Sequence, residues 1–129
     1  MTKIKELIAT MDRISQEERE IMISKNHDYA GEKDCLANIK ACEVMGICSS
    51  ETGIFTRMLD KFQRLVNLEK SEAMVKDEDV FQNIKDLRNY LAFLYHIKME
   101  KNEREREERE LRLTEQVRFQ VSAEASELG

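Results

Sequence analysis

The chain has 129 residues, of which 41% are hydrophobic, so it can build one modest domain with a single core. Acidic residues outnumber basic ones by 26 to 21. The resulting net charge of -5 excludes the broad basic surface that binds duplex DNA or an anionic membrane. Because there is no apolar run near the ~18 residues of a membrane span and no signal peptide pattern, we expect a cytoplasmic protein.

Helix breakers are scarce, since proline is absent and glycine occurs only four times, and strand patterns are missing. Residues 3–25 carry hydrophobic side chains at helical spacing, which predicts a long amphipathic first helix. A polar turn should follow it. A shorter second helix is then expected from Asp34, a helix-capping residue type, to a stop near Gly46.

Two further amphipathic helices are predicted. Ser49 and Ser50 offer a start for the third, which should run from about Glu51 to Glu69, and the fourth should begin near Asp77. Their inward-facing residues are expected to be Ile54, Met58, Phe62 and Leu65 in the third helix and Val80, Ile84, Leu87, Leu91 and Leu94 in the fourth. These elements predict an all-α fold with a four-helix bundle-like core in residues 1–99.

Residues 100–120 are dominated by charge, and they predict a long charged C-terminal helix extension that is solvated on all sides. Glutamate–arginine pairs four residues apart favour this helix, namely Glu100–Arg104, Glu105–Arg109 and Glu108–Arg112. Apolar residues of the extension are candidates for docking on a partner subunit: Leu111, Leu113, Val117 and Phe119. Residues 121–129 are expected to form a flexible tail.

The number and spacing of the cysteine and histidine residues do not indicate a metal site. Cys35, Cys42 and Cys48 contain no Cys-x-x-Cys pair and are too few for a four-ligand zinc site, so we expect buried, reduced thiols. His27 and His96 are far apart in the sequence.

A cationic stripe lies on the third predicted helix. Arg57, Lys61 and Arg64 stand at i, i+4 and i+7, within about 60° of one another beside the apolar side. Such side chains can turn into a cleft between helices, where guanidinium and ammonium groups suit phosphate oxygens. The alternative is that Asp60 pairs with Arg64 and that the other cations are ordinary surface charges.

The fourth predicted helix carries the opposite charge. Its polar residues form two stripes that share Asp86, namely Glu78, Gln82 and Asp86, and Asp79, Asn83, Asp86 and Tyr90. Oxygen ligands one turn apart can hold Mg²⁺ when substrate phosphates and water complete the octahedron. The alternative is that acidic residues stabilise the dipole at the helix start, which does not account for Asp86.

A third candidate cluster ends the first helix, just before a glycine-containing loop. Tyr29 is suited to stacking on a base, Asp28 to accepting from a sugar or base edge, and Lys25 to contacting a phosphate. The alternative is that this is an ordinary polar helix end with a tyrosine that packs in the core.

In the order KNHDYAG, RMLDKFQRLVNL and EDVFQNIKDLRNYLAFL, the sequence resembles the nucleotide modification associated domain 1 family over residues 20–97. That family consists of small helical proteins found largely in phages, which are distantly similar to the all-α, MazG-like pyrophosphohydrolases. Glu17 and Glu20 match the E-x-x-E half-motif of those enzymes, although a solvated charged face is the alternative.

The resemblance implies roles for individual residues. Its K-x-x-D-Y pattern falls on Lys25, Asp28 and Tyr29, its R-x-x-D-K-x-x-R-L pattern on Arg57, Asp60, Lys61, Arg64 and Leu65, and its final D-L-x-x-Y on Asp86, Leu87 and Tyr90. Its E-x-x-x-D-x-x-x-D pattern falls on Glu78, Gln82 and Asp86. Gln82 therefore replaces a carboxylate, and its amide is a weaker Mg²⁺ ligand that cannot act as a general base. The resemblance favours nucleotide binding over hydrolysis.

Three hypotheses about function follow. The first is a phage-type protein that binds a nucleoside phosphate through the cationic stripe, with or without Mg²⁺-dependent hydrolysis of a modified nucleotide. The second is non-catalytic sequestration of a nucleotide-derived immune signal. The third is a structural or adaptor protein. Under each of them we expect a homo-oligomer, because a helical unit this small gains core by pairing.

Overall fold

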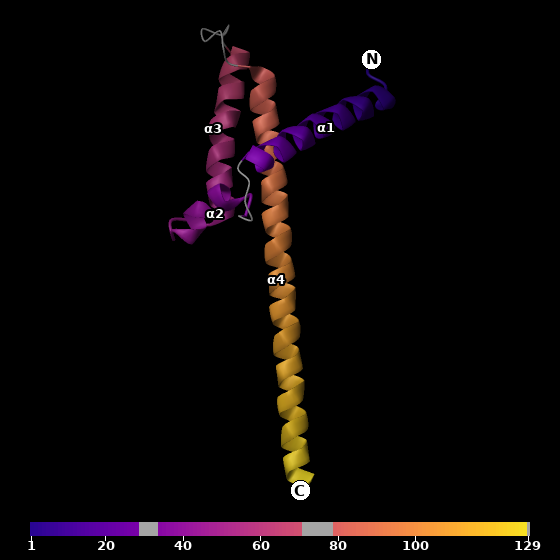
Figure 1. Ribbon diagram of the computed structural model, residues 1–129, viewed down its shortest axis with the longest axis vertical. Helices are drawn as coiled ribbons and strands as arrows, with labels where there is room; N and C mark the ends of the chain where they lie inside the picture. Colours follow the sequence, from indigo (N-terminus) through magenta and orange to yellow (C-terminus); the bar gives the residue numbers. More distant parts are fainter. Residues whose placement is uncertain (29–33, 71–78, 129) are drawn as a thin grey trace. The chain divides into compact units, whose positions relative to one another are not determined.

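The computed structural model describes residues 1–28, 34–70 and 79–128, with residues 26–28 as backbone only. These residues form four helices and no strand: α1 (Ile4–Asp28), α2 (Ala37–Val44), α3 (Ser50–Lys70) and α4 (Val80–Leu128) (Figure 1). The predicted all-α fold with a long C-terminal helix is therefore confirmed. The chain divides into two units, Met1–Phe93 and Leu94–Gly129.

The N-terminus of α1 is capped by a side chain from its own first turn. The Lys3 backbone N–H donates to Glu6 Oε2 at 3.1 Å, which satisfies one of the amide groups left without a partner at a helix start. The hydrophobic side predicted for this helix is present, and Ile14 on it is half-buried. Most of that side is nevertheless exposed: Ile4, Leu7, Ile8, Met11, Ile21 and Met22.

The short helix α2 begins later than predicted and ends where predicted. Asp34 Oδ1 accepts from the Leu36 backbone N–H at 2.9 Å, so this aspartate caps the turn that leads into the helix. At the other end Gly46 has a φ of 75°, a left-handed conformation that glycine adopts without steric cost. The N–H groups of Gly46 and Ile47 donate to the carbonyls of Glu43 at 3.0 Å and Cys42 at 2.9 Å, which completes a Schellman motif.

The start of α3 packs tightly against α2. Ser49 Oγ accepts from the Thr52 backbone N–H at 3.1 Å and so caps α3, as predicted. Ser50 is fully buried and donates from Oγ to Glu43 Oε2 at 3.1 Å. A Cβ at Gly53 would lie 2.7 Å from Cys42 Sγ, so only glycine allows this approach without movement. The adjacent Ile54 is 0% exposed.

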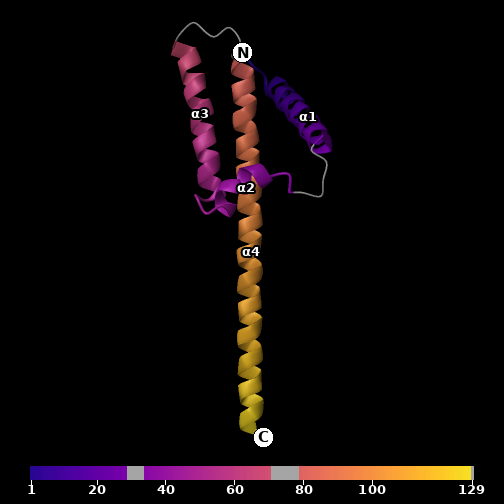
Figure 2. The ribbon, with the colours of Figure 1, turned by 60° about the vertical axis from the view of Figure 1, so that its left-hand side comes forward.

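Helices α3 and the first part of α4 lie side by side and run in opposite directions (Figures 1 and 2). Asp79 Oδ1 accepts from the Phe81 backbone N–H at 2.8 Å and so caps α4, whereas Asp77, near which we expected this helix to begin, lies outside the described residues. The prediction that Phe62, Ile84 and Leu91 face inward is wrong, because all three side chains are exposed. Amphipathic spacing places a residue on a helix side but does not show that another helix covers it.

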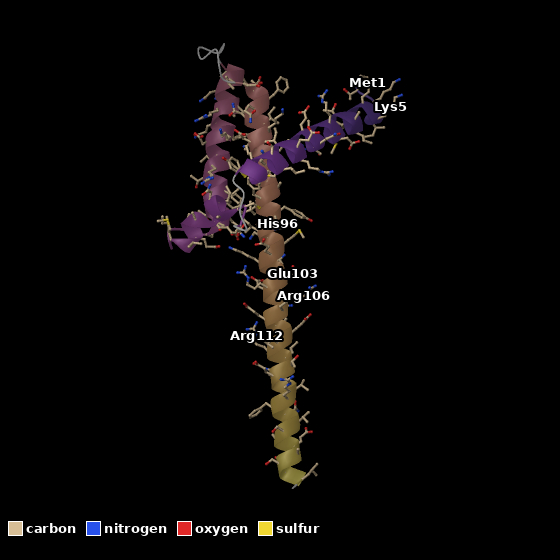
Figure 3. All side chains as sticks on the ribbon, viewed as in Figure 1. Met1, Lys5, His96, Glu103, Arg106 and Arg112 are labelled. Atoms are coloured by element: carbon tan, nitrogen blue, oxygen red, sulfur yellow. The ribbon has the colours of Figure 1, made fainter. Side chains whose placement is uncertain are left out.

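The unit Leu94–Gly129 consists of one helical segment whose residues 102–128 are all exposed. Its charged side chains extend outward along the helix, as Glu103, Arg106 and Arg112 do in Figure 3. Glu103 and Arg106 form an ion pair at 3.9 Å, three residues apart. The helix continues through residues 121–128, where we expected a flexible tail.

Candidate functional site

The cationic stripe occupies the middle of α3. Lys61 lies closest to the side of α3 that faces α4, and its side chain is 21% exposed. Arg57 and Arg64 lie to one side of Lys61 and are exposed. The three residues thus combine one half-buried ammonium group with two guanidinium groups that reach solvent.

An ion pair joins the cationic stripe to the acidic stripe of α4. Lys61 Nζ lies 2.9 Å from Asp86 Oδ2, and both side chains are largely shielded from water. The other carboxylate oxygen, Oδ1, accepts from Gln82 Nε2 at 3.0 Å. The two stripes that we identified separately are therefore adjacent, and both oxygens of Asp86 are engaged by neighbouring side chains.

The alternative interpretation of Arg64 also holds in the structure. Arg64 Nη2 lies 3.5 Å from Asp60 Oδ2, and each side chain is more than half exposed. Exposed pairs of this kind stabilise a fold by about 0–1 kcal/mol. A charge-assisted hydrogen bond to a phosphate is worth roughly 1.5–3 kcal/mol, so a phosphate can compete with Asp60 for this arginine.

The remaining predicted residues of α4 have structural contacts. Asp79 caps the helix, as described above, and Asn83 Nδ2 donates to the Asp79 carbonyl at 3.3 Å while being 4% exposed. Tyr90 packs edge-on against Phe93, with ring centroids 6.3 Å apart. Glu78 lies outside the described residues.

At the end of α1, Lys25 is exposed and Asp28 is the last helical residue, described by its backbone. Tyr29 lies outside the described residues. The proposed roles of these three residues in base and phosphate recognition therefore stay predictions.

Sequence reasoning missed a second set of ion pairs, between α1 and α4. Lys85 Nζ lies 3.3 Å from Glu17 Oε2, and Arg88 Nε lies 2.6 Å from Glu18 Oε1. Glu17 was predicted either as half of a metal motif or as a solvated charge, and here it is a partner of lysine. The partners are about 70 residues apart in the sequence, so no local spacing could have revealed them.

As they stand, the described residues do not fit a magnesium site. No group of three or more His, Cys, Asp or Glu side chains converges in that part of the chain. Asp86 is held by Lys61 and Gln82, and one oxygen of Asp79 accepts the backbone N–H of Phe81. We therefore derive no catalytic step through Mg²⁺.

The cysteines are free thiols, and their surroundings differ. Cys35 is exposed, contrary to prediction, whereas Cys42 and Cys48 are half-buried beside the α2–α3 turn. The pKa of the Cys48 thiol is raised above its usual value. The hydrogen bond with Cys42 is the largest cause, and burial is the second. This effect favours the neutral thiol and not a reactive thiolate.

No family model matches the sequence, and neither the curated proteins nor the solved structures compared with it gave a match. Within the described parts of the chain, no helix combines the length and the apolar character that crossing a membrane requires. What the protein does must therefore be argued from its own side chains.

Proposed function

We propose that this protein binds a nucleoside phosphate through Arg57, Lys61 and Arg64, as the resemblance to the nucleotide modification associated domain 1 family implies. The observation that supports it best is the arrangement of these three cations on one side of α3, in a chain whose net charge is -5. A local group of cations on an acidic protein selects a small anion rather than a long polyanion. We place this binding in the cytoplasm.

Each cation has a distinct part in the proposed site. Arg57 and Arg64 supply planar donor groups that can hold two phosphate oxygens each. Lys61 anchors α3 to α4 through Asp86 and offers its remaining N–H donors between the two arginines. The arginine Arg64 exchanges a weak exposed pair with Asp60 for a stronger bond to phosphate.

Binding without cleavage is favoured over hydrolysis. Gln82 donates to Asp86 instead of supplying a carboxylate, and Asp86 is already neutralised by Lys61. Phosphate binding needs only the cations, whereas hydrolysis also needs a group that activates water. A phage-type protein with these properties would sequester a nucleotide-derived signal.

The second candidate is a structural or adaptor protein, and a specific observation favours it. Two of the three cations have carboxylate partners in the structure, Lys61 with Asp86 and Arg64 with Asp60. In that case the charges stabilise the helices and bind no nucleotide.

The test is equilibrium dialysis of the protein against a panel of nucleotides and cyclic nucleotides, with and without Mg²⁺, followed by mass spectrometry of the ligand released by heat. Enrichment of an intact nucleotide is the expected result. Accumulation of a cleaved product would identify a hydrolase despite Gln82. Retention of no compound would contradict the proposal and favour the adaptor.

A further inference from the structure

One side of α3 is apolar and uncovered. Phe55, Leu59 and Phe62 are 53%, 57% and 57% exposed, while Ile54 on the neighbouring side of the same helix is fully buried. At 100° per residue these three side chains lie within about 60° of one another, so they form one continuous strip along the helix. A helix in a protein of this size normally buries such a strip.

One long border of this strip is free of charge. The residues that border it on the side away from α4 are Thr52, Thr56 and Gln63, which are exposed and uncharged. The chain as a whole is 36% charged. Aromatic enrichment with loss of charge is typical of the centre of a protein–protein interface.

The strip continues onto α4. Ile84 and Leu91 are exposed as well. The Lys61–Asp86 contact marks the sides of the two antiparallel helices that meet. At 100° per residue, the α3 strip and the exposed residues Ile84 and Leu91 of α4 both lie to the same side of this contact. We call Phe55, Leu59, Phe62, Ile84 and Leu91 the α3–α4 apolar face.

This face alone supplies more than half of the area that a dimer needs. A large apolar side chain that is about half exposed presents roughly 100 Å², so the five residues present about 500 Å². Their uncharged border adds to this value, and a stable interface buries about 800 Å² on each partner.

The spacing of α3 fits a second copy of the same chain. Phe55, Leu59, Phe62 and Val66 are separated by four, three and four residues, a pattern that reads the same in both directions. An antiparallel copy therefore places Phe55 opposite Val66 and Leu59 opposite Phe62. Each layer then pairs a large side chain with a smaller one, which is how helices pack without cavities or overlap.

We propose that the α3–α4 apolar face joins two copies of this chain, with their α3 helices antiparallel across a two-fold axis. Such an axis brings the same surface of each copy together. Arg57 and Arg64 lie on the opposite side of α3, at about 160–200° from the strip, so pairing leaves the cationic stripe open. The inference is thus independent of the proposed nucleotide binding.

Sedimentation equilibrium over a range of protein concentrations tests this interface. The full-length protein should form a species of twice its 15.2 kDa. Leu59→Lys should weaken association at least tenfold, whereas the matched control Ile23→Lys, at an apolar residue of similar exposure (57% and 64%), should leave it unchanged. A wild-type monomer at every concentration, or any assembly that survives Leu59→Lys, overturns the proposal.

A size exchange tests the antiparallel arrangement. Leu59→Phe alone places two phenylalanines in each central layer, and Phe62→Leu alone places two leucines there, so each change should weaken association several-fold. The double variant restores one leucine opposite one phenylalanine and should recover wild-type association within about threefold. Additive losses in the double variant would contradict this register. Because all of these positions are exposed, circular dichroism should show an unchanged helix content.

Discussion

Helix α4 contains two segments of different character. In residues 80–93 the charged side chains reach other helices: Asp86 pairs with Lys61 of α3, and Lys85 and Arg88 pair with Glu17 and Glu18 of α1. In residues 94–128, the ion pairs His96–Glu100 and Glu103–Arg106 lie within the helix itself. Charge of both signs thus serves tertiary packing in one segment and local helix stability in the other.

The difference follows from where the apolar residues are. In residues 80–93, charged residues alternate with hydrophobic residues at helical spacing. Because the hydrophobic residues pack against other helices, the charged side chains between them also lie next to those helices. Residues 100–110 contain no hydrophobic residue, so this stretch has nothing to bury and depends on pairs three or four residues apart. Substitutions in the two units should therefore lower the free energy of unfolding by different amounts.

The largest difference in unfolding free energy is expected between alanine substitutions of Ile54 and of Leu111. Ile54→Ala removes a fully buried side chain and should lower the free energy of unfolding by about 2–5 kcal/mol. Leu111→Ala removes an exposed one and should change it by less than about 0.5 kcal/mol. Urea unfolding followed by circular dichroism measures both. Similar losses for the two variants would mean that residues 94–128 are buried in an assembly.

The ion pair between α3 and α4 should come next in size. Lys61→Ala leaves the shielded carboxylate of Asp86 without its cation and should cost about 1–3 kcal/mol of unfolding free energy. Arg106→Ala, which removes an exposed pair within α4, should cost about 0–0.5 kcal/mol. Adding Asp86→Ala to Lys61→Ala should recover part of the loss, since no unpaired charge then remains. Full additivity of the two changes would contradict the coupling.

A smaller effect is expected where α2 meets α3. Gly53→Ala brings a methyl group against Cys42 Sγ and should destabilise the protein by about 1 kcal/mol. In a Cys42→Ala background the sulfur is absent, so the same change should cost less. Thermal unfolding of the four proteins of this cycle measures the difference. An equal cost in both backgrounds would show that the contact with Cys42 is not the cause.

The smallest effect concerns the thiols, all of which precede residue 94. The raised pKa of Cys48 reduces its thiolate fraction at a given pH, so the rise of its alkylation rate should occur at higher pH than that of a cysteine in an unstructured peptide. Mass spectrometry of iodoacetamide adducts as a function of pH measures the profile of Cys48. Cys42→Ala should move the Cys48 profile to lower pH, and an unchanged profile would contradict the role of that hydrogen bond.

Local rules predicted much of the fold from the sequence. Glycine at position 46 and serine at position 49 ended one helix and began the next as expected, because caps depend on the residue itself and its nearest neighbours. Asp77 and Asp79 are equally good caps by type, so the sequence placed the start of α4 only approximately. The contact with the Phe81 N–H identifies Asp79 as a cap.

Long-range features were harder to predict. The sequence placed Lys61 and Asp86 each on a polar stripe, but their contact depends on the register between α3 and α4. Phe62 was assigned inward because apolar spacing was the only guide, and α3 has two apolar sides of which only one is covered. Glu18 and Arg88 gave no local signal at all.

Calorimetric titration of the best-retained nucleotide tests the central claim most directly, using two variants with the same change in charge. Arg57→Gln/Arg64→Gln keeps Lys61 and its pair with Asp86, whereas Arg104→Gln/Arg109→Gln changes the exposed extension. Losing two charge-assisted contacts should weaken binding about 100-fold in the first variant. The second variant should bind like the wild type. Equal affinity in all three proteins would contradict the assignment of the phosphate site to α3.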